Sequence, residues 1–223
     1  AQYVAALDDT FAIEVTSYDW AKPPLCPTGW GMCPPPDNKY PVQVATLGGG
    51  LYGYVATAGE YGGWIVGDNP NTPETETRSV TSCMVLNDDY TTTGLGGLSG
   101  LQVTAAHEYV HAIQNGYGDP TPREDSLWYE SIAAYMEDEV LDSSNDNYQY
   151  LWPDWTQSLG QWPADNHYAN WILYRYAAEH NGGVLNPTGG QEVVRRIWKN
   201  IAQGQWGVVA FNNALGAKTP GAT

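Results

Sequence analysis

The sequence is poor in basic residues, with nine Lys and Arg against 25 Asp and Glu and a formal net charge of −16. A protein that binds a polyanion needs a basic face. Nine cationic residues can hardly form such a face on this acidic chain, so we expect neither nucleic acid nor a membrane surface as a partner.

Long apolar runs are missing as well. No segment approaches the 18 or more apolar residues of a membrane-spanning helix, so we expect a soluble chain. The first residues, AQYVAALDDTFAIEV, lack the basic stretch that opens a signal peptide. Because it begins with a residue other than Met, the sequence would suit a processed mature form.

Cysteine is scarce, with three residues in the chain. Cys26 and Cys33 lie in CPTGWGMC, a loop rich in Pro and Gly, where we expect a short disulfide. Cys83 lies in the apolar run CMVL, where we expect a buried free thiol. A disulfide would indicate an oxidising compartment.

The pattern along the chain changes from short strand-like runs to helices. Four runs that are rich in Val and Tyr and separated by glycine predict strands: YPVQVATL, LYGYVAT, GWIVGD and SCMVLND. Apolar residues at helical spacing predict helices over 2–16, 126–141, 165–181 and 190–203, with a short helical turn near 207–215. Another helix contains LQVTAAHEYVHAIQ, with a capping box at Ser99 and Gln102 and a stop at Gly116.

This order of elements predicts an α+β fold. We expect a single domain over residues 1–223, with a strand-rich N-terminal lobe over about 1–116 and a helical C-terminal lobe over about 117–223. The helix that contains HEYVH lies at the junction between the two lobes.

The motif HEYVH has the spacing of a zinc site. Residues four apart share one face of a helix, so His107 and His111 can present two ring nitrogens to one ion. Glu108 is rotated away from that face and can act as a general base on a water molecule. The alternative is two partly buried histidines without a metal, but the flanking apolar residues would make two unpaired imidazoles costly. Shuffling this composition would yield HExxH in roughly three sequences per thousand.

A catalytic zinc site needs a third protein ligand. The extended motif HExxHxxGxxH fails here, because Gln114 and Tyr117 stand where it requires glycine and histidine. Glu130 follows His111 with eighteen residues between them, and the Gly- and Pro-rich connection allows the chain to reverse. Glu130 is therefore our third ligand. Rival ligands are Asp119, Glu124, Asp125 and Glu137, of which Glu137 can alternatively support a ligating histidine from behind.

The segments VTAAHEYVHAIQNGYGD, WYESIAAYMEDEV and YANWILYRY resemble a family of secreted bacterial metalloproteases of the gluzincin type, whose pattern is HExxH with a downstream Glu. The likeness covers residues from about 80 to 200. It implies a zincin-like fold, zinc held by His107, His111 and Glu130, Glu108 as the base, and a secreted protein. Many gluzincins have an Asp four residues after the ligand Glu, where this sequence has Ala134.

The expected activity is therefore that of a zinc endopeptidase acting on a protein or peptide substrate as a monomer. His167 and Tyr168 are the candidate donors to the oxyanion of the reaction, and the resemblance favours the tyrosine. Residues 80–87 are assigned to an edge strand that pairs with the substrate. Aromatic side chains can line subsites or pack in the core: Trp128, Tyr129, Trp152, Trp155 and Trp162.

Two alternatives to this activity remain open. The protein can be a zinc hydrolase of non-peptide amides or esters, or a non-catalytic binding domain with a structural zinc. Calcium is a second candidate cofactor, because the loops NDDY (87–90) and DSSNDNY (142–148) are rich in oxygen ligands. Neither loop has the spacing of an EF-hand, so a solvated loop is the competing interpretation.

Overall fold

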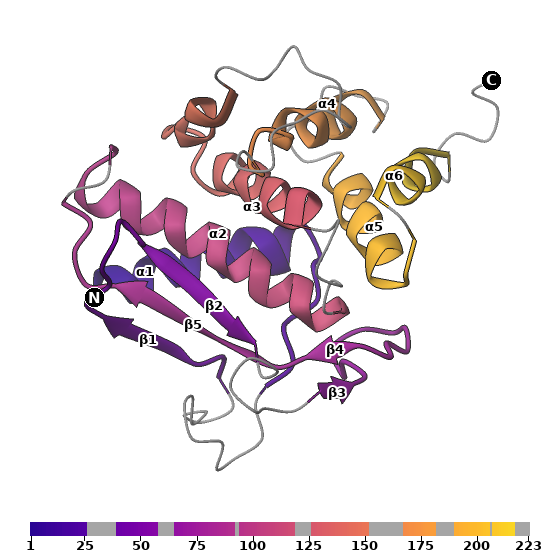
Figure 1. The fold of residues 1–223 in the computed structure, drawn as a ribbon, viewed down its shortest axis with the longest axis horizontal. Helices are drawn as coiled ribbons and strands as arrows, with labels where there is room; N and C mark the ends of the chain where they lie inside the picture. The colour runs from indigo at the N-terminus through magenta and orange to yellow at the C-terminus, as the bar shows by residue number, and fades with distance from the viewer. Residues whose placement is uncertain are drawn as a thin grey trace.

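The fold was examined in a computed structural model of the chain. It describes residues 1–25, 39–57, 65–91, 94–118, 126–151, 167–181, 190–205 and 207–216. Helices make up most of these residues, and a small sheet completes the fold (Figure 1). The α+β prediction is confirmed at this level. The described residues of the first half hold five short strands, so this half is less rich in strands than expected.

The main sheet has three strands in the order β1-β5-β2. Strand β1 (Val42–Ala45) runs parallel to β5 (Ser82–Asn87), and β2 (Gly53–Thr57) runs antiparallel to it. Met84 lies opposite Val42 on one side and Val55 on the other. All residues of β5 are buried because it has a neighbour on both sides.

This order corrects the expected edge strand. Residues 80–87 were assigned to the edge, but β5 is the central strand, and β1 and β2 are the edge strands. A fully apolar run such as CMVL is typical of a strand that is buried on both faces. A separate pair of short strands, β3 (Ile65–Gly67) and β4 (Ser79–Val80), lies beyond the main sheet. Strand β4 was not predicted.

The helices lie where the sequence periodicity places them. They are α1 (Gln2–Phe11) with a π-helical continuation η1 (Ala12–Ser17), α2 (Gly97–Tyr117), α3 (Ser126–Val140), α4 (Trp171–Asn181), α5 (Gln191–Ala202) and α6 (Gly207–Gly216). A 3-10 helix, η2 (Asp146–Leu151), follows α3. None of the helices in the described part of the chain is long and apolar enough to cross a membrane.

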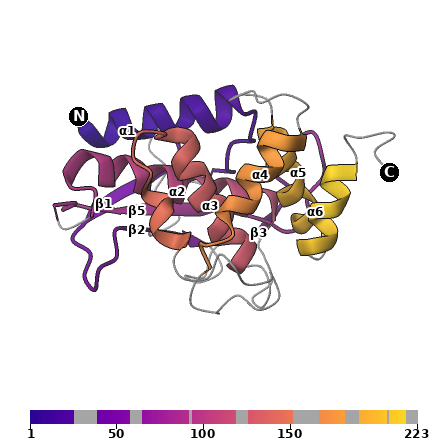
Figure 2. The same cartoon turned by 90° about the horizontal axis from the view of Figure 1, so that it is seen from above.

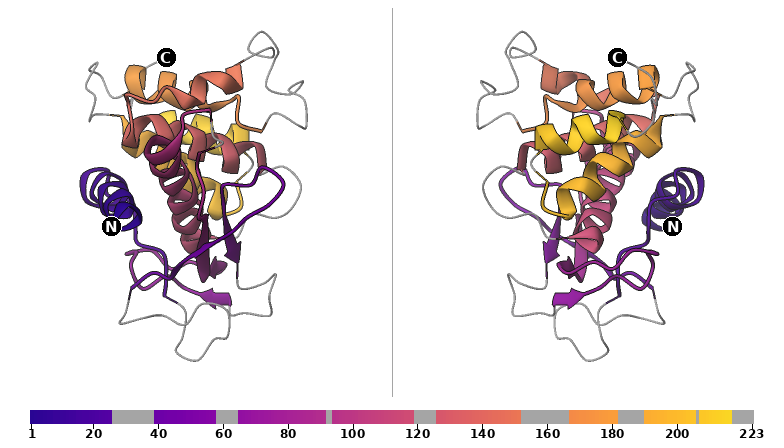
Figure 3. Two further views of the ribbon diagram at one scale, coloured as in Figure 1. Left: turned by 90° about the vertical axis from the view of Figure 1, so that its left-hand side faces the viewer. Right: turned by 90° about the vertical axis from the view of Figure 1, so that its right-hand side faces the viewer.

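Helix α2 lies at the centre of the fold. It contacts β2 and β5 of the sheet on one side, α3 and α5 on another, and α1 along its flank (Figures 2 and 3). Every residue from Ala105 to Tyr117 is therefore buried. The polar residues on this helix must then find most of their partners inside the protein, because little of their surface is exposed.

The start of α2 differs from the predicted capping box. The helix begins at Gly97, two residues before Ser99, and its N-cap Gly96 makes no side-chain capping bond. Gly96 and Gly97 have positive φ angles of 69° and 50°, a conformation that favours glycine. The backbone turn thus sets the start of the helix, and the helix continues through Gly116 to Tyr117.

Cys83 is disulfide-bonded, so the predicted free thiol is wrong. Cys26 and Cys33 lie outside the described residues. The apolar run CMVL concealed the disulfide of Cys83, since such surroundings are equally typical of a buried free thiol.

Candidate metal centre

Two packed helices bring the predicted ligands together. His107 and His111 lie one turn apart on α2, and Glu130 lies in the first turns of α3, which packs against α2. The Nε2 atoms of the two histidines are 3.0 Å apart. The Oε2 atom of Glu130 lies 3.1 Å from Nε2 of His107 and 3.3 Å from Nε2 of His111. Three potential ligand atoms therefore meet at one point.

The Nδ1 atom of each imidazole, on the opposite side of the ring from Nε2, is hydrogen-bonded to another side chain. Nδ1 of His107 lies 2.6 Å from Oε1 of Glu137, and Nδ1 of His111 lies 2.8 Å from Oε1 of Gln114. Gln114 donates through Nε2 to the carbonyl oxygen of Tyr129 at 3.1 Å, which leaves Oε1 as its acceptor. Each Nδ1 therefore donates a hydrogen bond, and the Nε2 atom of each neutral ring carries a lone pair.

Lone pairs of two imidazoles and a carboxylate oxygen thus converge, an arrangement that requires a positive charge among them. Ligands at 2.0–2.1 Å from a tetrahedral zinc ion lie roughly 3.3–3.4 Å from one another. The observed separations of 3.0, 3.1 and 3.3 Å are close to that value. In the part of the chain that the structure describes, this is the one group of three His, Cys, Asp or Glu side chains that could hold a metal ion.

The electrostatics of the group agree with this geometry. Burial disfavours the charged form of His107, yet the hydrogen bonds to Glu130 and Glu137 raise its pKa well above the ordinary value. Burial also disfavours the charged form of Glu130, but His111 and His107 outweigh it and hold the pKa of that carboxyl far below its usual range. The two shifts favour positive charge on His107 and negative charge on Glu130. The same field attracts a cation.

Glu108 lies beside the three candidate ligands without joining them. It is buried on the face of α2 towards β2, with a relative exposure of 7%. Burial raises its pKa, against the opposing effect of His107 and His111. A carboxylate with a raised pKa is closer to the neutral range in which a general base works best.

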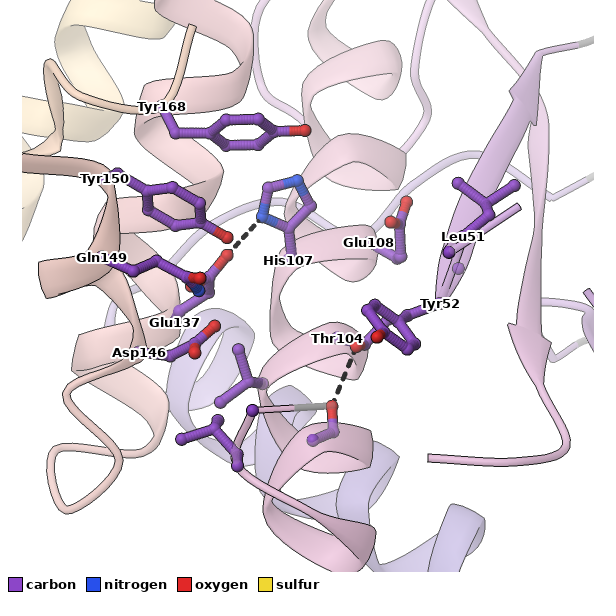
Figure 4. Close-up of a pocket in the computed structure, with 16 residues that line it drawn as sticks. Leu51, Tyr52, Thr104, His107, Glu108, Glu137, Asp146, Gln149, Tyr150 and Tyr168 are labelled. Carbon is purple, nitrogen blue, oxygen red and sulfur yellow. Dashed lines mark hydrogen bonds and ion pairs between the residues drawn. The ribbon is translucent and has the colours of Figure 1, made fainter. Parts of the chain in front are cut away.

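A cavity of about 330 Å³ opens next to His107 and Glu108. Its floor is formed by α2, one wall by the segment that enters β2, and the opposite wall by α3 and η2 (Figure 4). Tyr168, from the turn before α4, also lines it, with its ring centroid 5.7 Å from that of His107. The structure therefore brings Tyr168 to the site, whereas His167 is not among the lining residues.

Glu137 takes the supporting role that was one of its two predicted alternatives. It lies two helical turns after Glu130 and contacts Nδ1 of His107. This hydrogen bond to a histidine ring is one that the methyl group of Ala134 cannot make. Burial raises its pKa to about 7, although the contact with His107 acts in the opposite direction. The other rival ligands, Asp119, Glu124 and Asp125, lie outside the described residues.

The supports of His111 were missed from the sequence. Gln114 attracted notice only as a departure from another motif, yet it fixes the ring of His111. Tyr129 stacks on that ring with centroids 3.9 Å apart and planes 5° apart, and its hydroxyl accepts a hydrogen bond from Asn115 at 3.3 Å. Residues three apart share a helix face, so the spacing of His111 and Gln114 was the available signal.

The remaining predicted residues have other surroundings. Trp128 packs in the core against Tyr174 and Phe211. Trp152, Trp155 and Trp162 lie outside the described residues. In the acidic loops, Asp88 accepts a hydrogen bond from Thr46 and Asp89 from the backbone of Thr91. Calcium at these loops stays a prediction.

Comparison with known proteins yields no match: no family model, no curated protein and no solved structure matches the chain. The gluzincin resemblance is therefore carried by the motif residues and their flanking segments. What the residues can do chemically is inferred below from their geometry.

Proposed function

We propose that the chain is a zinc-dependent endopeptidase of the gluzincin type. The observation that carries the proposal is the convergence of His107, His111 and Glu130 next to a cavity that Glu108 lines. Two imidazoles and a carboxylate are a ligand set that suits zinc. The described residues supply three ligands, which leaves a fourth coordination position for solvent or substrate, as in catalytic rather than structural sites.

A zinc ion at this point would supply a Lewis acid that lowers the pKa of water to about 7 and polarises a carbonyl group. Glu108 takes a proton from the attacking water and later delivers it to the leaving amine. Its raised pKa supports this exchange, because the group must both accept and release a proton near neutral pH. Glu137 and Gln114 hold the two histidines in the tautomer that directs Nε2 towards the ion.

Tyr168 is the residue we assign to the oxyanion. Burial and the neighbouring Glu130, Glu108 and Glu137 raise its pKa above the ordinary value, so its hydroxyl keeps its proton and can donate a hydrogen bond. His167 stays the alternative donor. Strand β2 replaces residues 80–87 as the proposed partner of an extended substrate, because it is the edge strand of the main sheet whose entering segment lines the cavity.

An extracellular location is part of the proposal. The disulfide of Cys83 supports it, because disulfides form and persist in oxidising compartments. A hydrolase of non-peptide amides or esters would use the same residues, so assays on casein-like proteins and on small amides and esters separate the two activities.

The decisive variant is Glu108→Gln, which keeps the size of the side chain and removes the base. We expect cleavage of a protein substrate to fall by roughly 10²–10⁴-fold while zinc content is unchanged. Glu179→Gln is the matched control, since Glu179 lies on α4 in a surface ion pair with Arg175 and should leave activity unchanged. Full activity in Glu108→Gln would exclude this mechanism.

A further inference from the structure

The cavity beside the candidate metal centre has an uneven distribution of charge. Three acids line it, namely Glu108, Glu137 and Asp146, and the described residues that line it include no lysine or arginine. Glu137 and Asp146 lie together on the wall formed by α3 and η2, with Gln149 next to them (Figure 4). The opposite wall, at Leu51, belongs to the segment that enters β2.

One carboxylate oxygen of Glu137 has no partner among the described residues. Its Oε1 atom is hydrogen-bonded to His107, whereas its Oε2 atom is buried and has no hydrogen-bond partner in the described part of the chain. The residue is 2% exposed and lines the cavity. A buried acceptor without a donor costs free energy, which a donor from a bound ligand would recover. This oxygen is an observation independent of the acidic composition, and it indicates where the donor of a ligand would lie.

The rest of the lining suits the stem of a basic side chain. Leu51, Leu95 and Val103 provide apolar surface, and lysine and arginine bury their methylene groups along such surface while the charged end meets polar groups. The volume of about 330 Å³ is at the lower end of the range of ligand pockets, roughly 300–1,000 Å³. One side chain fits this space better than a large ligand.

We propose that this cavity is a specificity pocket for a lysine or arginine side chain, with Asp146 and Oε2 of Glu137 receiving the cationic group. The proposal rests on the proposed peptidase function, and it adds a preference for peptides with a basic residue beside the cleaved bond. Asp146 is the residue that sets the preference, because Glu137 also supports His107 and cannot be changed without disturbing the metal centre.

The first test measures binding without cleavage. The zinc-loaded protein is titrated with Nα-acetyl-lysine amide and with its neutral counterpart Nα-acetyl-norleucine amide, and amide shifts are followed by NMR. We expect the lysine compound to bind roughly tenfold more tightly, with shifts at residues 51–53 and 146–150. Asp146→Asn should remove most of this difference, whereas Asp142→Asn, an exposed acid near the same loop, should keep it. Equal binding of the two compounds to the wild-type protein, or no binding of either, overturns the proposal.

The second test identifies cleavage sites in a peptide library by mass spectrometry. Enrichment of Lys and Arg at one position beside the cleaved bond, reduced in Asp146→Asn and retained in Asp142→Asn, supports the pocket. Cleavage without enrichment overturns the pocket and leaves the peptidase function intact. Absence of cleavage together with selective binding of the lysine compound overturns the peptidase function and leaves the cationic site.

Discussion

Helices α2 and α5 bury their residues in different ways. Helix α5 buries one glutamine and an apolar stripe formed by Val193, Val194, Ile197, Trp198 and Ile201. Its basic residues are partly exposed. Helix α2 is buried on every side from Ala105 to Tyr117, and polar side chains lie among the apolar ones. Packing alone accounts for α5. It does not account for α2, because packing of the apolar core does not explain why the two histidines, Glu108 and Gln114 are buried.

The comparison separates burial that stabilises the fold from burial that indicates a functional site. Burial of an apolar stripe stabilises the fold wherever the helix lies. Burial of two histidines and a carboxylate is costly unless hydrogen bonds and a cation compensate for it. The Nδ1 atoms of His107 and His111 are hydrogen-bonded to other side chains of the protein, whereas the two Nε2 atoms face each other at the candidate metal centre. That asymmetry is the reason for assigning function to this region.

Removing a ligand should have the largest effect on the proposed activity. Glu130→Ala takes away the one charged ligand of the group, so we expect loss of stoichiometric zinc and a fall in kcat of roughly 10³-fold or more, since metal assistance is worth several kcal/mol. Metal content and cleavage rate are measured on the same preparation. Asp9→Asn, an exposed acid on α1, should retain both. Stoichiometric zinc in Glu130→Ala would remove that residue from the ligand set.

Moving the general base without changing it should have the next largest effect. A Cβ atom at Gly53 would lie 2.7 Å from Cγ2 of Thr104 and 2.9 Å from Cγ of Glu108, so Gly53→Ala must displace the side chain of Glu108 or the strand. A displacement of about 1 Å can cost on the order of 10²-fold in rate, and we expect that loss in kcat with zinc retained. Gly48→Ala meets no atom within 4 Å and should be active. Equal rates for the two variants would mean that β2 does not position Glu108.

The support behind a histidine should matter less than the ligand itself. Gln114→Leu removes the acceptor that orients His111 and leaves the three ligands in place. We expect zinc affinity to fall by roughly 10–100-fold, measured by competition with a chromophoric chelator. Gln2→Leu at the exposed start of α1 is the control. An unchanged affinity in Gln114→Leu would show that stacking on Tyr129 holds the ring by itself.

A change in α5 should affect stability and leave the metal centre unchanged. Ile197 is fully buried, so Ile197→Ala should lower the free energy of unfolding by about 2–5 kcal/mol. Urea titration measures this loss, and elemental analysis of the folded variant should still find zinc. Loss of zinc from the folded protein would mean that α5 contributes to the site and would weaken the contrast with α2.

Glu14 is a buried acid in the π-helical segment η1, outside both α2 and α5. Both of its carboxylate oxygens are buried without hydrogen-bond partners among the residues that the structure describes, and burial raises its pKa well above the ordinary value. The folded state then holds a proton that the unfolded state releases, so this group costs stability as pH rises above about 4.5. We expect Glu14→Gln to be more stable than the wild-type protein at pH 8, with a smaller difference at pH 4, in urea titrations. A difference independent of pH would contradict this account.

The sequence predicted the helices and the grouping of the candidate ligands well because both depend on local spacing. Periodicity located the long helices of the described residues, and the four-residue step from His107 to His111 identified two candidate ligands on one helix face. Glu130 could be chosen because the glycines and prolines after α2 allow the chain to reverse. The start of α2 was placed too late, since Ser99 has the residue types of a cap while the backbone turn occurs at Gly96 and Gly97.

Features that depend on distant contacts were not predictable in the same way. The strand order places β5 between β1 and β2, and this order depends on pairing between segments that are distant in the sequence, although the apolar run CMVL is compatible with a buried strand. The disulfide of Cys83 was not predictable from the apolar run CMVL, because such a run is equally typical of a buried free thiol. The cavity draws its lining from α2, α3, η2 and the segment before β2, so its charge emerges only from the tertiary structure.

Elemental analysis of the purified chain, after dialysis against zinc-containing and then metal-free buffer, tests the central claim most directly. The convergence of two imidazole nitrogens and one carboxylate oxygen predicts about one tightly held zinc ion per chain, lost on treatment with a strong chelator. A chain that is folded by circular dichroism and retains no metal under these conditions would contradict the assignment of His107, His111 and Glu130 as a metal centre.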